Sequence, residues 1–526
     1  MSQPLETLEN SKFVKESKQN IVNVIFGRSM VVAFLLIVQI LLLFSLFYRF
    51  ARYSPYYVGA TLIFTASMLI YVLNTRANPS MKLSWCILIA VFPVFGALLY
   101  VYVRNDLGHR MEQKLLHYTF SESAPYIPDQ SEVMEKLKRE DRSLYNLASY
   151  TLKNSGCPAY DNTTVRYFPL GEDKFAEMLV QLEKAEKFIF LEYFIIGEGY
   201  MWGSVLEILE RKAKAGVEVR LMYDGTCAFS TLPYNYPKEM EKRGIRCKMF
   251  SPIRPMVSTH YNNRDHRKIL VIDGHTAFTG GVNLEDRYIN RQEVYGHWKD
   301  TAVMVQGDAA RSFTLMFLQM WNATERQRVY EPYLNVPIPH QEGAVGYVLP
   351  YGDSPLDDEN VGEMVYLNML HQAKDHVYIM TPYLILDNET ITALRFAAGR
   401  GVDVRIILPH IPDKKYAFTL AKTHYRELTE AGVKIYEYTP GFVHAKVFLV
   451  DGREAVVGTI NLDYRSLYHH FECAAYLSGV PALKDIRADF DHTLSLCHEI
   501  TAEDIKNRPL KERLLGGLLK VAAPLM

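Results

Sequence analysis

Apolar residues are unevenly distributed along this chain. Three uncharged, mainly apolar runs occupy residues 29–48, 53–75 and 83–103, and each is bracketed by basic residues. A helix needs about 20 apolar residues to cross the hydrocarbon layer of a bilayer. Aromatic side chains gather at the ends of these runs, as they do at membrane interfaces. The pattern predicts three transmembrane helices, at about 29–48, 57–75 and 83–103, in a membrane anchor of residues 29–104.

The residues around the three runs leave the orientation of the anchor open. Six basic residues fall on one predicted side of the membrane and five on the other, so the positive-inside rule does not decide which side faces the cytoplasm. The first run is too long for the apolar part of a cleaved signal peptide, and further runs follow it. We therefore predict an N-terminal segment of residues 1–28, then the anchor, then a linker of residues 105–130.

Beyond the linker, polar and apolar residues alternate in a pattern that occurs twice. The segment "KAEKFIFLEYFI" at 184–195 matches "QAKDHVYIMTPYLI" at 372–385. Gly244 matches Gly432, 188 residues further on, and other matching positions have similar offsets. A nearly constant offset indicates an internal duplication.

Each copy reads as short apolar strands that alternate with helices of ten to fifteen residues. This alternation predicts an α/β fold in which helices cover a sheet. We expect two duplicated halves, residues 131–335 and 336–526, packed about a pseudo-twofold axis.

Each half carries one sparse polar motif on an apolar run. The motifs "HRKILVID" and "HAKVFLVD" supply the candidate catalytic residues His266, Lys268, Asp273, His444, Lys446 and Asp451. Side chains on a strand alternate between its two faces, so each His projects with its Lys while each Asp faces away or sits in the turn. Because a twofold axis brings equivalent motifs face to face, we expect both His–Lys pairs to meet in one cleft.

The chemistry of two such pairs suits phosphoryl transfer. Two lysines attract an anionic group, and two imidazoles with an ordinary pKa of about 6.5 suit a nucleophile and a general acid. A single His-x-Lys on an apolar strand is commonplace. Here both pairs recur at the duplication offset, and each is followed by Gly-x-x-Asn, at 280–283 and 458–461. Because the cations are built in, we expect neither a metal nor another cofactor.

The composition argues against nucleic acid as a partner. A net charge of −1 gives no bulk electrostatic attraction for nucleic acid, so we expect no nucleic-acid partner. The six cysteines are scattered without metal-like spacing, which favours buried or free thiols.

The paired motif resembles the H-x-K-x₄-D hallmark of the phospholipase D superfamily. The strings "GFVHAKVFLVDGREAVVGTINLDYRSL", "RIILPHIPDKK" and "FPVFGALLY" are similar to bacterial cardiolipin synthases, and the likeness covers nearly the whole chain. The resemblance implies an α/β/α sandwich in each half and a covalent phosphohistidine intermediate. It implies phosphatidyl transfer between two phosphatidylglycerol molecules, which gives cardiolipin and glycerol. The implied location is a bacterial inner or plasma membrane, as a multi-pass protein, with self-association left open.

Roles for individual residues follow from the same resemblance. His266 would be the nucleophile and His444 the general acid, while Asn283 and Asn461 would help the lysines hold phosphate oxygens. The family also carries an acidic residue downstream of each His that orients its imidazole. Asp300, 34 residues after His266, and Glu472, 28 residues after His444, fit this position. Asp273 and Asp451 would then brace turns or pair with backbone and lysine.

Two positions depart from the family pattern, which usually has Asn at both. Asp265 precedes His266, and His470 lies two residues before Glu472. Neither departure removes a catalytic group, but both leave the local polarity and the pH preference open. We expect His469 and His470 to be loop or supporting residues.

Two groups of alternative functions remain. The same motif fits a hydrolase, or a phosphatidyltransferase with another acceptor, because water and an alcohol differ only in which one reaches phosphorus. A nucleic-acid enzyme or a catalytically silent binding protein agrees poorly with the charge and the three apolar runs. The C-terminal segment 510–526 is either an interfacial helix or the last core helix.

Overall fold

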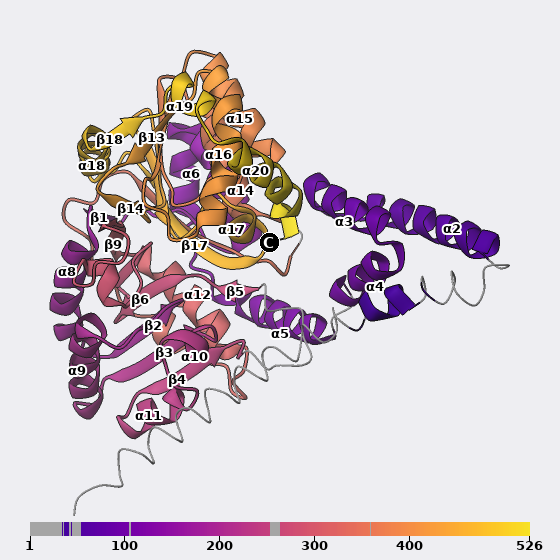
Figure 1. Ribbon diagram of the computed structural model, residues 1–526. Coiled ribbons are helices and arrows are strands. Elements are labelled where there is room, and N and C mark those ends of the chain that lie inside the picture. The colour runs from indigo at the N-terminus through magenta and orange to yellow at the C-terminus, as the bar shows by residue number, and fades with distance from the viewer. Residues whose placement is uncertain are drawn as a thin grey trace, which may run out of the picture. The chain divides into compact units, whose positions relative to one another are not determined.

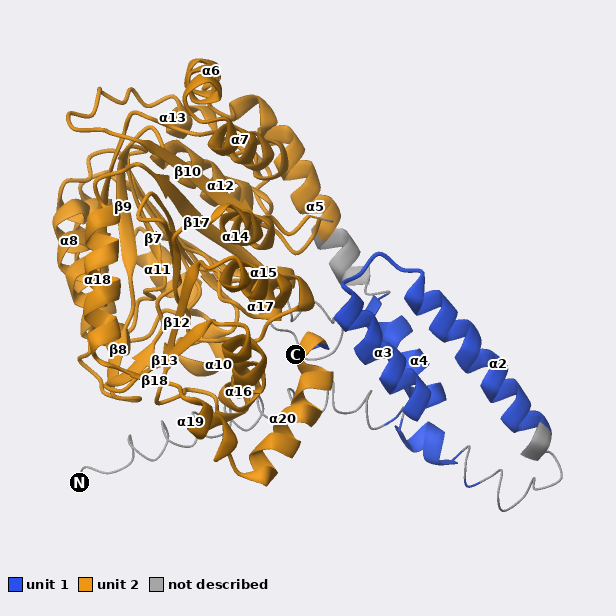
Figure 2. Cartoon of the chain, turned by 90° about the horizontal axis from the view of Figure 1, so that it is seen from above, with its two compact units in different colours: residues 1–112, 253–261, 525 blue, residues 113–252, 262–524, 526 orange. Residues whose placement is uncertain are grey.

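The chain forms two compact units (Figures 1 and 2). The first comprises residues 1–112 with 253–261 and 525, and the second comprises 113–252, 262–524 and 526. The computed structural model describes residues 34, 36–41, 44, 54–104, 107–252, 263–357 and 359–525.

The first unit contains three apolar helices, α2 (Ser54–Leu73), α3 (Pro79–Val91) and α4 (Pro93–Arg104). They meet in a small core that includes the ring of Tyr100, which packs edge-on against Trp85. Among the described residues, α2 is the one helix both long and apolar enough to cross a membrane. It covers the second predicted span, whereas the first, 29–48, lies for the most part outside the described residues.

The third predicted span is not one continuous helix. Phe92 leaves the helical conformation, with φ −128° and ψ 76°, and Pro93 starts a separate helix. Proline has no N–H and disfavours a helical residue before it. Gly96 lies so close to the end of α3 that a Cβ there would come within 2.8 Å of the Leu88 carbonyl oxygen. At about 1.5 Å per residue, neither piece alone matches the thickness of about 30 Å of a bilayer core.

The predicted linker, 105–130, contains a helix, α5 (Leu107–Ser123), and a 3₁₀ turn, η2 (Ala124–Tyr126). Leu116 of α5 is buried in the core of the second unit. Two further helices follow, α6 (Ser131–Glu140) and α7 (Arg142–Ser155). Although they begin the predicted first half, their apolar residues share a core with strands of the second half.

The first half of the second unit is built on a mixed seven-stranded sheet. Its three strands at one side are parallel and the remaining pairs are antiparallel. In spatial order the strands are β1 (Thr163–Phe168), β9 (Ala302–Gly307), β7 (Thr276–Gly280), β6 (Lys268–Ile272), β2 (Phe188–Tyr193), β3 (Glu218–Asp224) and β4 (Arg246–Phe250).

The second half repeats this order strand for strand and adds one antiparallel edge strand, β18. The match confirms the predicted duplication. The strands are β10 (Tyr347–Asp353), β17 (His470–Ser478), β16 (Glu454–Gly458), β15 (Val447–Val450), β11 (His376–Met380), β12 (Asp403–Pro409), β13 (Lys434–Tyr438) and β18 (Cys497–Glu499).

Helices flank both sheets (Figure 1). Those of the first half are α8 (Gly171–Glu183), α9 (Tyr200–Lys214), α10 (Cys227–Ser230), α11 (Tyr236–Lys242), η4 (Asp286–Ile289), α12 (Ala310–Asn322) and α13 (Glu331–Leu334). Those of the second half are α14 (Val361–Gln372), α15 (Asn388–Gly399), α16 (Lys415–Glu430), α17 (Tyr464–Tyr468), α18 (Leu483–Ser495), α19 (Ala502–Lys506), α20 (Leu510–Ala522) and η5 (Ala523–Leu525).

The two halves share one core. Helix α12 is buried on nearly all sides and contacts strands of both sheets. Its Phe317 stacks on Phe190 of β2, with ring centroids 4.7 Å apart. The pair of sheets therefore forms a single compact unit.

Two strand pairings connect the halves directly. In each, a short strand of one half, called here an exchanged strand, lies beside a strand of the other half. From the first half, β5 (Arg264–Asp265) pairs with β17 of the second. From the second half, β14 (Gly441–Val443) pairs with β8 (His297–Lys299) of the first. Both pairings are parallel and occupy equivalent places in the repeat, so the exchange is symmetric.

Candidate active site

The first exchanged strand fixes His266 beside Glu472. Strand β5 leads directly into His266, whose backbone N–H donates to the Phe471 carbonyl at 3.0 Å. Glu472 is the next residue on β17, and its two carboxylate oxygens lie 2.9 and 3.0 Å from His266 Nδ1. The carboxylate is fully buried.

The second exchanged strand places His444 beside Asp300 in the same way. Strand β14 leads into His444, whose backbone N–H donates to the Lys299 carbonyl at 2.7 Å. Asp300 follows Lys299, and its Oδ2 lies 2.7 Å from His444 Nδ1. Each half therefore supplies one imidazole and the carboxylate for the other imidazole.

The expected assignment of the carboxylates within each half is wrong. We expected Asp300 to orient His266 and Glu472 to orient His444, because each carboxylate follows that His along the chain. The exchanged strands reverse the pairing, since β17 lies against the segment before His266 and β8 against the segment before His444. The two acidic residues are the predicted ones, but each serves the opposite half.

The two lysines lie within the same buried cluster. Lys268 Nζ donates to the His266 carbonyl at 2.5 Å. Lys446 Nζ donates to the His444 carbonyl and lies 2.9 Å from His444 Nδ1. Burial lowers the pKa of Lys268 to about 8 and that of Lys446 to about 7, against the attraction of Asp300 and Glu472.

The imidazoles lie in a positive environment. Burial, followed by the charges of Lys268 and Lys446, lowers the pKa of both histidines well below the usual value. Their neutral form therefore dominates at neutral pH, as a nitrogen nucleophile requires. Burial also raises the pKa of Asp300 to about 6, although both lysines oppose the rise.

The two asparagines make equivalent local contacts. Asn283 Nδ2 donates to the Tyr288 hydroxyl at 2.8 Å, and Asn461 Nδ2 donates to Ser466 Oγ at 3.0 Å. Asn283 Oδ1 also accepts the Ile195 N–H at 3.0 Å. These contacts hold each amide within its own half and leave a second N–H on each Nδ2.

The structure does not bring Asp273 and Asp451 to the histidines, which corrects their inclusion among the catalytic residues. Asp273 lies at the opposite end of β6 from His266 and accepts backbone N–H groups of residues 186–188 at 2.7–2.8 Å. Asp451 accepts those of residues 374–376 at 2.8–2.9 Å. Both adopt a positive φ, near 50°, at the hairpin turn. Each aspartate therefore ties a strand end to a neighbouring turn.

The first departure from the family pattern, Asp265, pairs with a buried arginine. Its Oδ1 lies 3.3 Å from Arg267 Nε, and Arg267 also pairs with Glu192. The extra negative charge therefore faces a buried guanidinium.

Of the two alternatives expected for His470, a loop residue or a supporting residue, the structure agrees with the second, because His470 begins strand β17 and is buried. Its ring centroid lies 5.4 Å from that of His266, and its Nδ1 lies 3.7 Å from Glu472 Oε1. Burial lowers its pKa to about 3, so the ring is neutral at physiological pH. His470 is thus a direct neighbour of the site.

The groups His266, His470 and Glu472 lie within 4.8 Å of one another, a spacing that a metal ion can use. The positive charges of Lys268 and Lys446, which lower the pKa of His266, oppose a cation at this point. A phosphate oxygen would be attracted by the same charges. The electrostatics favour an anion.

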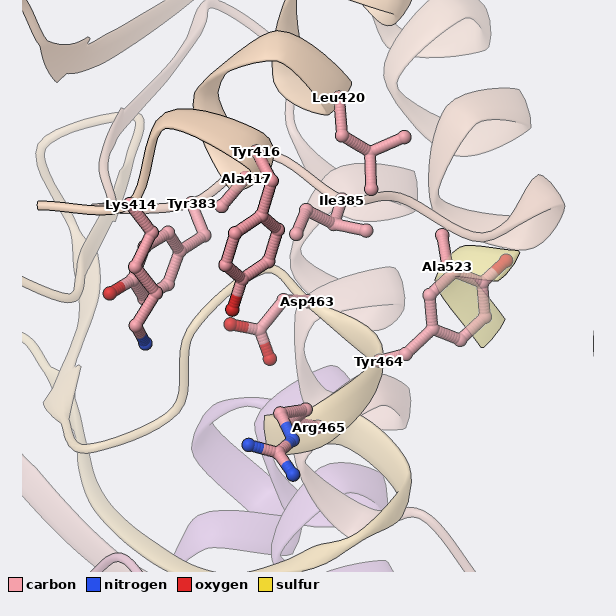
Figure 3. Close-up of a pocket in the computed structure, with 10 residues that line it drawn as sticks. All are labelled: Tyr383, Ile385, Lys414, Tyr416, Ala417, Leu420, Asp463, Tyr464, Arg465 and Ala523. Carbon is pink, nitrogen blue, oxygen red and sulfur yellow. The ribbon is translucent and has the colours of Figure 1, made fainter. Parts of the chain in front are cut away.

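A pocket of about 290 Å³ lies in the second half (Figure 3), and none of the motif histidines, lysines or asparagines is in its lining. Its lining includes Lys414, Asp463 and Arg465, which we did not single out from the sequence. Lys414 is close enough for its charge to lower the pKa of both catalytic-motif histidines. In the sequence, the sign that Lys414 could belong to the site was its place in the string "HIPDKK", which is part of the family resemblance.

Known proteins are similar to this chain in sequence and in fold. The family described as "Cardiolipin synthase, PLD-like domain" matches residues 178–321 and 366–494, and "Phospholipase_D-nuclease N-terminal" matches 63–105. A cardiolipin synthase of Alkalihalophilus pseudofirmus is 32% identical over 92% of this chain and 98% of its own length. One of Geobacillus kaustophilus is 34% identical over 89% and 93%, respectively.

Two further comparisons give one related sequence and one similar fold. An uncharacterized protein of Streptococcus mutans is 54% identical over 87% of this chain and 99% of its own length. The crystal structure of phosphatidylserine synthase from Haemophilus influenzae superposes with a TM-score of 0.54 at 15% identity, over 73% of this chain and 98% of that one. The second likeness concerns the fold alone.

The duplicated sheets and the paired His–Lys motifs define a phospholipase D-type enzyme. Within that class, the family match and the relatives show that this chain belongs to the cardiolipin synthases.

Proposed function

We propose that this protein transfers a phosphatidyl group from one phosphatidylglycerol to a second, producing cardiolipin and glycerol. The crossed pairs, His266 with Glu472 and His444 with Asp300, carry the proposal because they place two oriented imidazoles beside two buried lysines. The names of the relatives support the choice of substrate.

In the first step, neutral His266 attacks phosphorus through Nε2 while Glu472 accepts the hydrogen bond from Nδ1–H. A P–N bond forms as the bond from phosphorus to the glycerol oxygen breaks. The negative charge of the bound phosphate favours the protonated form of His444, which then donates its proton to the departing oxygen, so glycerol leaves as a neutral alcohol. Glu472 stabilises the positive charge that develops on His266, as the aspartate of a catalytic triad does.

In the second step, the roles of the imidazole pair reverse. His444, now neutral, accepts a proton from a glycerol hydroxyl of the second phosphatidylglycerol. That oxygen attacks phosphorus, the P–N bond breaks, and His266 returns to its starting form. Lys268 and Lys446, with Asn283 and Asn461, would hold the non-bridging phosphate oxygens through both steps.

The histidines differ in a way that supports His266 as the nucleophile. Both oxygens of Glu472 face His266 Nδ1, so this nitrogen holds its proton and leaves Nε2 free to attack. His444 Nδ1 instead has one oxygen of Asp300 and the ammonium of Lys446 as neighbours. A ring that exchanges protons in each step suits the general acid and base.

We further propose a multi-pass location in a bacterial plasma membrane. Helix α2 has the length and composition of a span. Residues 29–48 form an uncharged run of similar length, and the matched N-terminal family covers 63–105. A membrane location would concentrate both lipid substrates around the enzyme.

The proposal is tested with labelled phosphatidylglycerol and membranes that carry the wild type or His266→Ala. Cardiolipin and glycerol are expected from the wild type and should be lost in the variant. Phosphatidic acid as the main product would instead identify a hydrolase, in which water replaces the second lipid.

A further inference from the structure

The C-terminal helix α20 has two contrasting faces. One packs on α16, where Gly516 is buried and a Cβ would come within 2.7 Å of Thr423 Cγ2. The opposite face exposes four leucines with exposed fractions of 47–72%: Leu510, Leu514, Leu515 and Leu518. Spacings of three and four residues place these side chains along one side of the helix. Soluble surfaces rarely carry such a contiguous apolar strip without a partner.

Basic residues surround this helix. A cavity of about 510 Å³ lies where α20 meets α16 and α19, and its charged lining consists of Lys422, Arg426, Glu430, Lys506, Arg508 and Arg513. Glu430 pairs with Arg426 at 2.8 Å. The cavity thus has a clear excess of positive charge, which attracts anionic lipid headgroups and repels a second copy of the same surface.

The end of α20 borders the pocket of Figure 3. Ala523, the residue after the helix, lines the pocket of Figure 3 together with Ile385 and Leu420. In that view the charged groups Lys414 and Asp463 lie toward the other side. The pocket therefore runs from an apolar wall at the end of α20 to charged groups near the two histidines.

We propose that α20 docks on an anionic lipid surface through its leucine strip and sets the mouth of this pocket at that surface. A phosphatidylglycerol headgroup can then enter between Lys414 and Arg465 while its acyl chains stay in the lipid. This inference rests on the proposed function, because it concerns how the lipid substrate reaches the same site.

The test uses the full chain in nanodiscs that contain phosphatidylglycerol, and compares the wild type with Leu514→Glu/Leu518→Glu. Each protein is also assayed with monomeric dihexanoyl phosphatidylglycerol, which needs no docking. The variant is expected to lose at least tenfold in rate on bilayer lipid and to stay within twofold on the soluble lipid. Val180→Glu, which changes an exposed apolar residue of α8, is the matched control and should keep both rates.

The outcomes separate the two proposals. A wild type that makes cardiolipin from neither lipid contradicts the proposed function. A variant that loses both rates equally, or that changes from dimer to monomer by light scattering, shows a structural or self-association role for the leucine strip. Full activity of the variant on bilayers overturns docking.

A second arm tests the charge. At a fixed fraction of phosphatidylglycerol, the wild type should work several-fold faster when the remaining lipid is phosphatidylserine rather than phosphatidylcholine. Lys506→Glu/Arg513→Glu should abolish that difference while the rate on soluble lipid is retained. Equal rates of the wild type in both lipids would overturn the preference for an anionic surface.

Discussion

His266 and Glu472 belong to different halves of a duplicated fold, yet Glu472 holds His266 Nδ1 with both carboxylate oxygens, at 2.9 and 3.0 Å. The equivalent pair, His444 and Asp300, crosses in the opposite direction. Each carboxylate therefore orients the imidazole of the other half, and the candidate site is complete only when the halves are joined.

The crossed pairing predicts which variants behave alike. Glu472→Gln should resemble His266→Ala, and Asp300→Asn should resemble His444→Ala, with kcat for phosphatidylglycerol lowered by about 10²–10⁴-fold in the carboxylate variants. Phosphatidyl-p-nitrophenol separates the pairs, because its phenolate leaves without protonation. Asp300→Asn should still release p-nitrophenol in a burst, whereas Glu472→Gln should not. The opposite grouping would contradict the crossed pairing.

Activity should depend on pH with an alkaline limit set by the lysines. Their charged forms hold phosphate, and burial lowers the pKa of Lys268 to about 8 and that of Lys446 to about 7. Raising the pH through this range removes positive charge, so kcat/KM for phosphatidylglycerol should fall by about tenfold per pH unit for each lysine. On the acid side the lowered pKa of His266 keeps it neutral, so activity should persist below pH 6.5. A pH–rate profile of kcat/KM measures both limits.

The alkaline limit can be assigned with Lys446→Arg. A guanidinium stays protonated across this range, so the variant should lose the lower of the two alkaline transitions whatever its absolute rate. An unchanged profile would show that Lys446 does not set the limit.

Asp273 should matter for stability rather than for chemistry. Asp273→Ala removes the acceptor for the backbone N–H groups of residues 186–188, at a cost of about 1–3 kcal/mol in the free energy of unfolding. A lower midpoint of thermal unfolding is expected, with kcat of the folded protein within twofold. Asp451→Ala is the matched variant in the second half. A large loss of kcat without a loss of stability would assign a catalytic role instead.

Lys414 and Arg465 should contribute to the binding of lipid phosphate. Each lines the pocket of Figure 3, and the side chain of Lys414 is 48% exposed, so screening by water limits its effect. Replacing either residue with alanine should raise KM for phosphatidylglycerol by about three- to tenfold and change kcat little. Steady-state kinetics test this, with Lys214→Ala, an exposed lysine at the end of α9 in the first half, as the control. A drop in kcat at constant KM would place the two cations in the chemical step.

Removal of metal ions should leave the rate unchanged. The cluster of His266, His470 and Glu472 has the spacing of a metal site, but the nearby lysines oppose a cation. Full activity is expected after dialysis against EDTA. A loss that Zn²⁺ or Mg²⁺ reverses would show that the cluster binds a metal that the reaction needs.

Much of the fold was predictable because it is encoded locally. The alternation of apolar strands and helices predicts the sheets, and the constant offset predicts that the second sheet repeats the first. Because side chains on a strand alternate between its two faces, the sequence correctly predicts that Asp273 does not lie beside His266. A local pattern is less informative where one residue changes the backbone. Pro93 divides the third predicted span into α3 and α4, although the apolar run continues through it.

By itself, the sequence, with the family resemblance, supplied the candidate residues: two His–Lys pairs, two asparagines and two acidic residues at the expected distances along the chain. Only the tertiary structure decided which carboxylate serves which imidazole. The reason is physical, because two short parallel strand pairings, β5 with β17 and β14 with β8, place each His against the backbone of the opposite half. Spacing along a chain cannot encode a contact that forms only when two separate sheets exchange strands.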